Sequence, residues 1–211
     1  MRLLLASASP RRAEILGALG IPFDLAPADV DETVLPGESG RDAAARLAHA
    51  KAAAAASLHP GAWVLAADTL VLIDGAILGK PRDDREAAGM LRRLSGREHL
   101  VVTAVSLRRD AGPETGTVEE TRVRIAPLDE EEIRWYVATG EPRDKAGAYA
   151  VQGLGARFVE SVDGSFSNVM GLPARSVYRL LRQAPDPALA RLALASAGAS
   201  SRTSVRPPPP G

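Results

Sequence analysis

Residues 4–16 read LLASASPRRAEIL, and within a few positions they change from an apolar run to a helix-like pattern. The apolar residues of 2–6 are typical of a short buried strand. Pro10 suits the first turn of a helix because its fixed φ is already helical, and Ser9 suits the N-cap position before it. The stretch therefore predicts a strand over 2–6 followed directly by a helix over 10–19.

Strand-like and helix-like segments continue to alternate along the chain. Asp74-Gly75 lies between two apolar runs and predicts a hairpin, because a type I′ turn needs positive φ at both central positions. Helices that alternate with both single strands and hairpins predict an α/β fold with a mixed sheet. The expected helices are 39–58 with Ser39 as N-cap, 83–94, 129–139 ended by Gly140, and one opened by Pro173. The expected strands are 63–68, 99–107 and 117–125.

The length and composition indicate one globular domain followed by a tail. The chain has 211 residues, of which 45% are hydrophobic and 25% charged, as is ordinary for a globular protein. After residue 183 the composition changes to Ala, Ser and Pro, and four prolines precede the last residue. We expect one domain over 1–183 and a mostly disordered tail over 184–211, in which ALARLALA could form a short helix.

The charge balance limits the classes of partner. Lys plus Arg and Asp plus Glu number 26 each, so there is no large positive field to attract nucleic acid or an acidic membrane surface. No window approaches the roughly 20 apolar residues of a membrane span, and the short apolar run near the N-terminus does not resemble a signal peptide. Cysteine is absent, which excludes disulfide and thiolate chemistry. We expect a cytoplasmic protein without nucleic-acid or membrane partners.

Two hydroxyls and two guanidiniums gather where the first strand gives way to the first helix. Ser7, Ser9, Arg11 and Arg12 lie at a helix start, whose free N–H groups and dipole favour an anion. Arginine forks also match phosphate oxygens. Two interpretations stay open at this point, a phosphate cradle and a capped surface helix with solvated arginines. The lysine-containing GxxxxGK[ST] phosphate loop does not occur.

Lys51 interrupts an apolar face of the long helix predicted over 39–58. Its neighbours on that face are Ala and Leu at three- and four-residue spacing. Such a lysine usually extends its ammonium group to water, and this is the interpretation that the pattern alone favours. The alternative is a partly buried cation that binds an anion such as a substrate phosphate.

Asp68 follows the apolar run of 63–67 and thus ends a predicted buried strand. Ligands commonly bind at strand ends of open α/β sheets, where an aspartate can hold Mg²⁺ or activate water, or simply form an Asx turn into Thr69. Glu32, in an acidic loop, is a candidate second metal ligand, because Mg²⁺ bound with phosphate needs only one or two carboxylates. Lys80, held extended before a proline, is a candidate phosphate-facing cation.

The segment 139–158, TGEPRDKAGAYAVQGLGARF, has many glycines and few bulky side chains, which suggests backbone lying close to a ligand. Gln152 has donors and an acceptor suited to the edge of a base, although an ordinary surface glutamine would look the same. The chain's three histidines show no metal spacing and no GxSxG elbow occurs, so we expect neither a zinc site nor an acyl-transfer triad.

Taken together, these motifs resemble the Maf family of nucleoside triphosphate pyrophosphatases over residues 2–183. The resemblance implies an α/β fold similar to that of the inosine triphosphate pyrophosphatases (Maf/Ham1), with a mixed, twisted sheet flanked by helices, two lobes around a cleft, and a homodimer. It rests on LASASPRR (5–12), DE (31–32), LAHAKA (47–52), AADTLV (66–71), LGKP (78–81), LSG (94–96), TGEPRDKAGAYAVQGLG (139–155) and GSFSNVMGLP (164–173).

The resemblance also implies an activity. DKAGAYAVQG is similar to the subgroup that hydrolyses dTTP and UTP to the monophosphate and pyrophosphate with Mg²⁺ or Mn²⁺, a house-cleaning role with a link to division arrest. It implies Asp68 as proton acceptor and metal ligand, with Glu32 as the metal-associated acid. The implied phosphate residues are Ser7, Arg11, Arg12, Lys51 and Lys80, and those implied in base selection are Arg12, Thr69 and Gln152.

Two alternatives are carried with this hypothesis. The first is the same chemistry on 7-methyl-GTP or inosine-type nucleotides. The second is a regulator of septation that binds nucleotide without hydrolysing it. Under the main hypothesis, Asp68 orients and deprotonates a metal-activated water that attacks the α-phosphorus.

Overall fold

The computed structural model describes residues 2–194, whose centre is a seven-stranded sheet of order β2-β1-β3-β5-β6-β7, with β4 paired to β3. β1 runs parallel to β2 and β3, and the other neighbours are antiparallel, so the predicted mixed sheet is confirmed. The strands are β1 (Leu3–Leu5), β2 (Asp24–Leu25), β3 (Trp63–Ile73), β4 (Ala76–Leu78), β5 (Glu98–Arg109), β6 (Thr115–Ile125) and β7 (Val159–Asp163).

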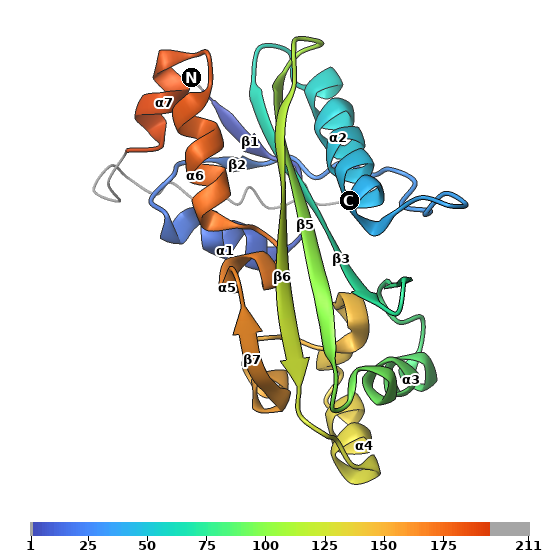
Figure 1. Ribbon diagram of the computed structural model, residues 1–211. Coiled ribbons are helices and arrows are strands. Elements are labelled where there is room, and N and C mark those ends of the chain that lie inside the picture. The colour runs from blue at the N-terminus through green and yellow to red at the C-terminus, as the bar shows by residue number, and fades with distance from the viewer. Residues whose placement is uncertain (1, 195–211) are drawn as a thin grey trace, which may run out of the picture.

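Helices cover both faces of the upper part of the sheet (Figure 1). Alternate residues of β3 point to opposite faces, so Val64 and Ala66 pack toward α2 while Leu65 and Ala67 pack toward α1, α6 and α7. The helices are α1 (Pro10–Ala18), α2 (Gly40–Leu58), α3 (Asp84–Leu94), α4 (Glu130–Ala138), α5 (Phe166–Val169), α6 (Ala174–Gln183) and α7 (Pro187–Leu192).

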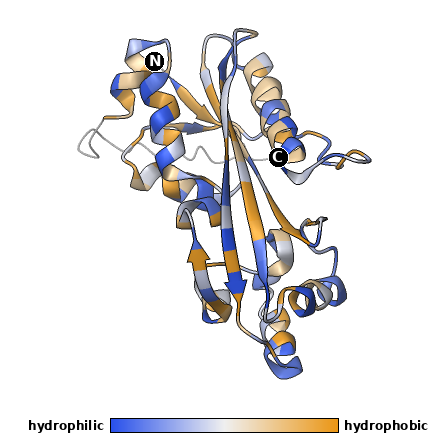
Figure 2. Cartoon of the chain, viewed as in Figure 1, coloured by the Kyte–Doolittle hydropathy of each residue, from blue (hydrophilic) through white to orange (hydrophobic). Residues whose placement is uncertain are grey.

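The long strands β3, β5 and β6 connect this upper lobe to a lower one, which contains α3, α4, β7 and three 3₁₀ turns (Figure 1). The lower lobe has its own apolar core around Leu91, Ile133 and Tyr136. Figure 2 shows the hydrophobic residues concentrated on the strands and on the inner sides of the helices. The turns are Glu141–Asp144, Ala146–Ala148 and Gly153–Phe158.

Local signals predicted most element ends correctly. Ser39 caps α2 by accepting a hydrogen bond from the backbone N–H of Asp42. Asp74 and Gly75 have φ values of 51° and 72° and form the predicted tight turn between β3 and β4. Gly140, with a φ of 76°, follows α4 as the left-handed residue that ends a helix.

The prediction that a strand ends at Asp68 is wrong. β3 continues to Ile73 because β5 pairs with it from Trp63 to Leu72. On its other edge, β1 pairs only up to Leu65 and β4 only from Val71, so in the described chain no strand pairs with that edge over residues 66–70. Asp68 therefore lies in the middle of a strand but beside a notch in the sheet edge.

The expectation of a disordered tail over 184–211 is wrong for its first part. α7 packs against α6 and the upper lobe, where the side chain of Leu189 is fully buried. The indole N–H of Trp63 donates to Asp186 Oδ2 at 3.0 Å, which ties the start of α7 to β3. The remainder, 195–211, lies outside the described residues. No helix within 2–194 is long and apolar enough to cross a membrane.

We predict that Leu189→Ala lowers the free energy of unfolding by about 2 kcal/mol, because it leaves a cavity beneath α7. The matched control is Leu194→Ala, since Leu194 is 60% exposed and its truncation removes little packing. Urea denaturation followed by circular dichroism measures both. Equal stability of the two variants would show that α7 does not belong to the folded domain.

Candidate active site

A cavity of about 590 Å³ opens at the notch in β3, between the two lobes. Its walls come from the β1–α1 connection, α2, β3, the end of β4 and the glycine-rich segment after α4. All ten candidate residues from the sequence line this one cavity: Ser7, Ser9, Arg11, Arg12, Glu32, Lys51, Asp68, Thr69, Lys80 and Gln152.

Lys51 is buried at the α2 side of the cavity and does not extend to water. Its ammonium nitrogen lies 2.5 Å from Asp68 Oδ1 and 2.5 Å from Glu32 Oε1, so it pairs with two carboxylates at once. The interpretation favoured by the sequence pattern, a lysine that extends to water, is therefore wrong. The alternative, a buried cation paired with an anion, is correct. Apart from Leu47, the side chains that bury α2 beside Lys51 are alanines, which let the helix approach β3 closely.

The pKa values of the two carboxylates shift in opposite directions although both carboxylates pair with Lys51. Burial raises the pKa of Asp68, because the charged form loses hydration, and this outweighs the attraction of Lys51. Burial is also the largest single influence on the pKa of Glu32 and raises it, but the hydrogen bond and charge of Lys51, together with the charges of Lys80 and Arg12, outweigh burial and the net shift is downward. The site thus makes Asp68 more basic, and Glu32 less basic, than an ordinary carboxylate of the same kind.

Arg12 lies on the opposite face of β3, where its guanidinium binds only neutral acceptors among the described residues. It donates to the carbonyl of Gly171 at 2.8 Å, to Thr69 Oγ1 at 3.1 Å and to Ser7 Oγ at 3.3 Å. Burial lowers its pKa, and Asp68 and Glu32 oppose that shift from a distance. Arg12 therefore carries a positive charge that no hydrogen-bonded carboxylate neutralises.

The start of α1 differs in detail from the predicted capped helix. Ser9 is the residue at the N-cap position, but its side chain makes no capping hydrogen bond, and Ser7 Oγ instead accepts from the backbone N–H of Ser9 at 3.1 Å. Arg11 is half-buried and lies 3.7 Å from Asp144 of the lower lobe. The structure thus disfavours a capped surface helix with solvated arginines.

The lower lobe contributes both predicted and unforeseen groups. Lys80 and Gln152 are exposed at the cavity rim. Asp144 and Lys145 also line the cavity, and Lys145 Nζ donates to the backbone carbonyl of Glu141 at 3.1 Å. The sequence analysis gave neither residue a role, although both belong to the DKAGAY motif.

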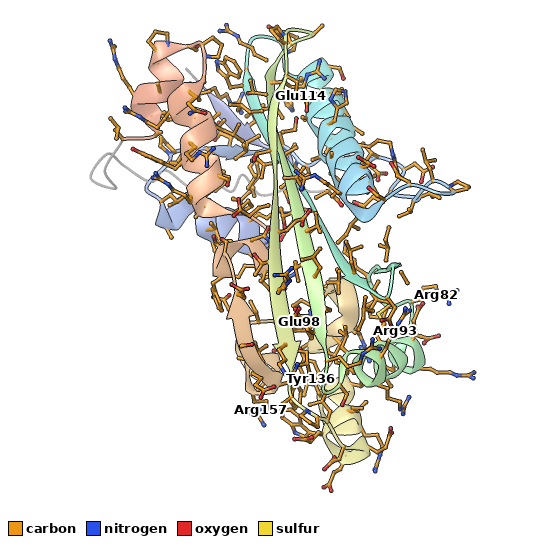
Figure 3. The ribbon with its side chains drawn as sticks, in the orientation of Figure 1. Arg82, Arg93, Glu98, Glu114, Tyr136 and Arg157 are labelled. Carbon is orange, nitrogen blue, oxygen red and sulfur yellow. The ribbon has the colours of Figure 1, made fainter. Side chains whose placement is uncertain are left out.

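Glu141 supports the glycine-rich wall from behind, a role that the sequence analysis missed. Its carboxylate accepts from the Tyr136 hydroxyl at 2.8 Å and from the backbone N–H groups of Gly155 at 2.9 Å and Leu154 at 3.0 Å. The Tyr136 hydroxyl in turn accepts from the backbone of Ala150 at 3.1 Å. Figure 3 labels Tyr136 at the lower end of the sheet, where these segments meet.

His99 has a structural position and His49 lies on the surface. His99 is buried, its Nε2 lies 2.7 Å from the Tyr149 hydroxyl, and burial lowers its pKa to about 4, so it is neutral at pH 7. His49 is exposed and pairs with Glu114. Within residues 2–194 no group of three or more His, Cys, Asp or Glu side chains could hold a metal ion without ligands from elsewhere.

Comparison with known proteins identifies close relatives along nearly the whole domain. The family model described as Maf-like protein matches residues 2–184. The chain is 55% identical over 189 residues to a dTTP/UTP pyrophosphatase of Anaeromyxobacter dehalogenans (strain 2CP-C), covering 88% of this chain and 95% of that protein. It is 53% identical over 186 residues to the protein of the same name from Myxococcus xanthus (strain DK1622), covering 88% and 93%.

Two solved structures that the chain matches are more distant in sequence. The Staphylococcus aureus Ham1 protein superposes with a TM-score of 0.48 at 15% identity, covering 92% of this chain and 96% of that chain. A HAM1 protein from Coxiella burnetii gives the same TM-score of 0.48 at 21% identity, covering 70% and 86%.

We predict that Glu141→Ala destabilises the protein by about 2 kcal/mol, because it leaves a buried tyrosine hydroxyl and two backbone N–H groups without their acceptor. The free energy of unfolding in urea measures the loss. The matched control is Glu130→Ala, which removes an exposed glutamate paired with Arg92. If both variants unfold at the same urea concentration, Glu141 does not support the wall.

Proposed function

The chain belongs to the Maf family, and on that premise we propose that it hydrolyses dTTP and UTP to the nucleoside monophosphate and pyrophosphate. The observation that carries the proposal is the cavity itself, where cations from α1, α2 and the segment after β4 meet two carboxylates at the notch. This combination suits a triphosphate, whose negative charge must be bound while water is delivered to one phosphorus.

Asp68 is the proton acceptor in the proposed mechanism. Lys51 occupies Asp68 Oδ1, and among the described residues no donor binds Oδ2, which leaves that oxygen for a water molecule. The water oxygen forms a bond to the α-phosphorus, the bond from that phosphorus to the oxygen bridging to the β-phosphorus breaks, and Asp68 receives the proton. Burial favours this step because it raises the pKa of Asp68.

The cations stabilise the charge that moves onto the leaving pyrophosphate. Arg12 has donors to spare after its three neutral contacts, and Arg11 and Lys80 border the same cavity from either lobe. Ser7 and Ser9 place hydroxyls at the helix start, where backbone N–H groups favour an anion. Gln152, at the rim, would meet the base with its amide.

Asp68 and Glu32 are the residues that would hold a divalent cation. Their oxygens both lie 2.5 Å from Lys51 Nζ, and two carboxylates together with phosphate oxygens and water form the hard oxygen donor set that Mg²⁺ or Mn²⁺ prefers. A bound ion would supply charge neutralisation for the triphosphate.

We also infer that residues 1–183 form the catalytic unit, onto which α7 packs, and that the protein acts in the cytoplasm as a homodimer. Sedimentation velocity of the full chain measures the mass in solution, and a monomer at micromolar concentration would contradict the dimer.

The decisive experiment is a panel of nucleotides supplied with Mg²⁺ or Mn²⁺ and scored for pyrophosphate release. We expect dTTP and UTP to be hydrolysed faster than the others. Preference for 7-methyl-GTP or inosine triphosphate would keep the chemistry and change the substrate. No turnover on any nucleotide would favour a regulator of septation that binds nucleotide without hydrolysing it.

We predict that Asp68→Asn lowers kcat by roughly 10² to 10⁴ while binding of a non-hydrolysable dTTP analogue stays within a few fold, because the amide cannot accept the proton. Steady-state kinetics and calorimetry measure the two quantities. Asp74→Asn, at the exposed hairpin of the same strand, is the matched control. Wild-type turnover by Asp68→Asn would overturn the assignment.

A further inference from the structure

A chain of hydrogen bonds runs through the sheet directly behind the cavity wall. Thr69 of β3 and Thr103 of β5 are paired in register, and their Oγ1 atoms lie 2.9 Å apart. Thr103 Oγ1 lies 3.1 Å from the backbone carbonyl oxygen of Asn168 in α5. Thr103 and Asn168 are fully buried, whereas Thr69 is half-buried and lines the cavity.

The two ends of this chain set the direction of every bond in it. The Asn168 carbonyl can only accept, so the single hydroxyl hydrogen of Thr103 goes to it. Thr103 must then accept from Thr69, which uses the single hydroxyl hydrogen of Thr69. At the other end, Arg12 can only donate, and its Nη2 lies 3.1 Å from Thr69 Oγ1. Hydrogen bonds therefore run from Arg12 through both threonines to Asn168.

The segment around Asn168, at the far end of this series of hydrogen bonds, is held in place by further hydrogen bonds. The side-chain amide nitrogen of Asn168 donates to the Val101 carbonyl at 3.0 Å and to Thr121 Oγ1 at 3.0 Å. The same segment provides the Gly171 carbonyl that accepts from Arg12 Nε at 2.8 Å. The hydrogen bonds therefore close into a ring. If Thr103 donated to Thr69 instead, its lone pair would face the Asn168 carbonyl oxygen at 3.1 Å, and that oxygen already accepts from the backbone N–H of Gly171 at 2.9 Å.

The direction of these hydrogen bonds decides whether Thr69 can donate a hydrogen bond to a ligand or accept one from it. With its hydrogen committed to Thr103, its hydroxyl presents only a lone pair to the cavity. An ionised phosphate oxygen has no hydrogen to donate, so Thr69 does not suit the triphosphate. An N–H group of the substrate base suits it well. Thymine and uracil carry a hydrogen on N3, whereas cytosine has a bare nitrogen acceptor there.

We propose that Thr103 is a positioning residue for base selection: by taking the hydrogen of Thr69 it makes Thr69 an obligate acceptor, which favours the N3–H of thymine or uracil and rejects cytosine. The inference rests on the proposed function and adds to it the group that excludes cytosine nucleotides. Thr103 itself is fully buried and acts only through Thr69.

The test is the ratio of kcat/KM for dTTP to kcat/KM for dCTP, measured in the wild type, Thr103→Val and Thr103→Ser. Valine removes the acceptor, so the Thr69 hydroxyl can turn its hydrogen into the cavity. We expect the ratio to fall at least about tenfold in Thr103→Val, because dTTP is used less well and dCTP better. Thr103→Ser keeps a hydroxyl at this position and should restore the wild-type ratio.

Each outcome decides for or against the inference. If Thr103→Val is folded by circular dichroism and keeps the wild-type ratio, or loses activity on both substrates by the same factor, Thr103 is only structural. If that variant does not fold, the wild type with N3-methyl-dTTP decides: turnover equal to that of dTTP overturns the proposal, and a loss of tenfold or more supports it.

A sugar hydroxyl could also donate to Thr69, and 3′-deoxythymidine triphosphate distinguishes this source. Preference for dTTP over the 3′-deoxy compound that disappears in Thr103→Val, with N3-methylation tolerated, would overturn recognition of the base. Wild-type hydrolysis of dTTP and UTP tests the proposed function separately, because it does not depend on the ratio to dCTP.

Discussion

The ammonium group of Lys51, held between Asp68 and Glu32, is the interaction on which the site depends. A buried lysine is costly unless its charge is paired, and here one cation is matched by two carboxylates at 2.5 Å. The small side chains of α2 let the helix pack closely against β3, so the lysine reaches the strand. Removing Lys51 would leave the carboxylate of Asp68 buried without its paired cation, which ties the fold of this region to its chemistry.

Because side chains alternate along a β-strand, β3 presents different functional groups on its two faces. Asp68 and Thr69 are adjacent, so their side chains point to opposite sides of β3. Asp68 meets Lys51 from α2, and Thr69 meets Arg12 from α1. Because the edge of β3 is unpaired at these positions, both faces open into the same cavity. The carboxylates and Lys51 thus lie on one side, and Arg12 with the neutral acceptor Thr69 lies on the other.

Irregular segments form part of the cavity wall, and buried polar side chains hold them in position. Glu141 holds the glycine-rich turn through three hydrogen bonds, and Asn168 holds the segment that carries Gly171. Gly171 has a φ of 105°, a backbone conformation that residues with a Cβ rarely adopt, so glycine suits the turn that presents its carbonyl to Arg12. These loops are held by hydrogen bonds where no regular ladder does so.

The sequence by itself determined the α/β class, the caps of α2 and α4 and the hairpin at Asp74-Gly75, because these depend on local propensities. It also determined which residues line the cavity, because they belong to motifs that follow one another in a characteristic order. Tertiary structure alone decided that Lys51 is buried, that β3 continues past Asp68, and that α7 joins the domain. It also decided the supporting roles of Glu141 and Thr103. Each of these depends on partners far away in the sequence, such as Asn168 behind Thr103, and local patterns carry no signal of such contacts.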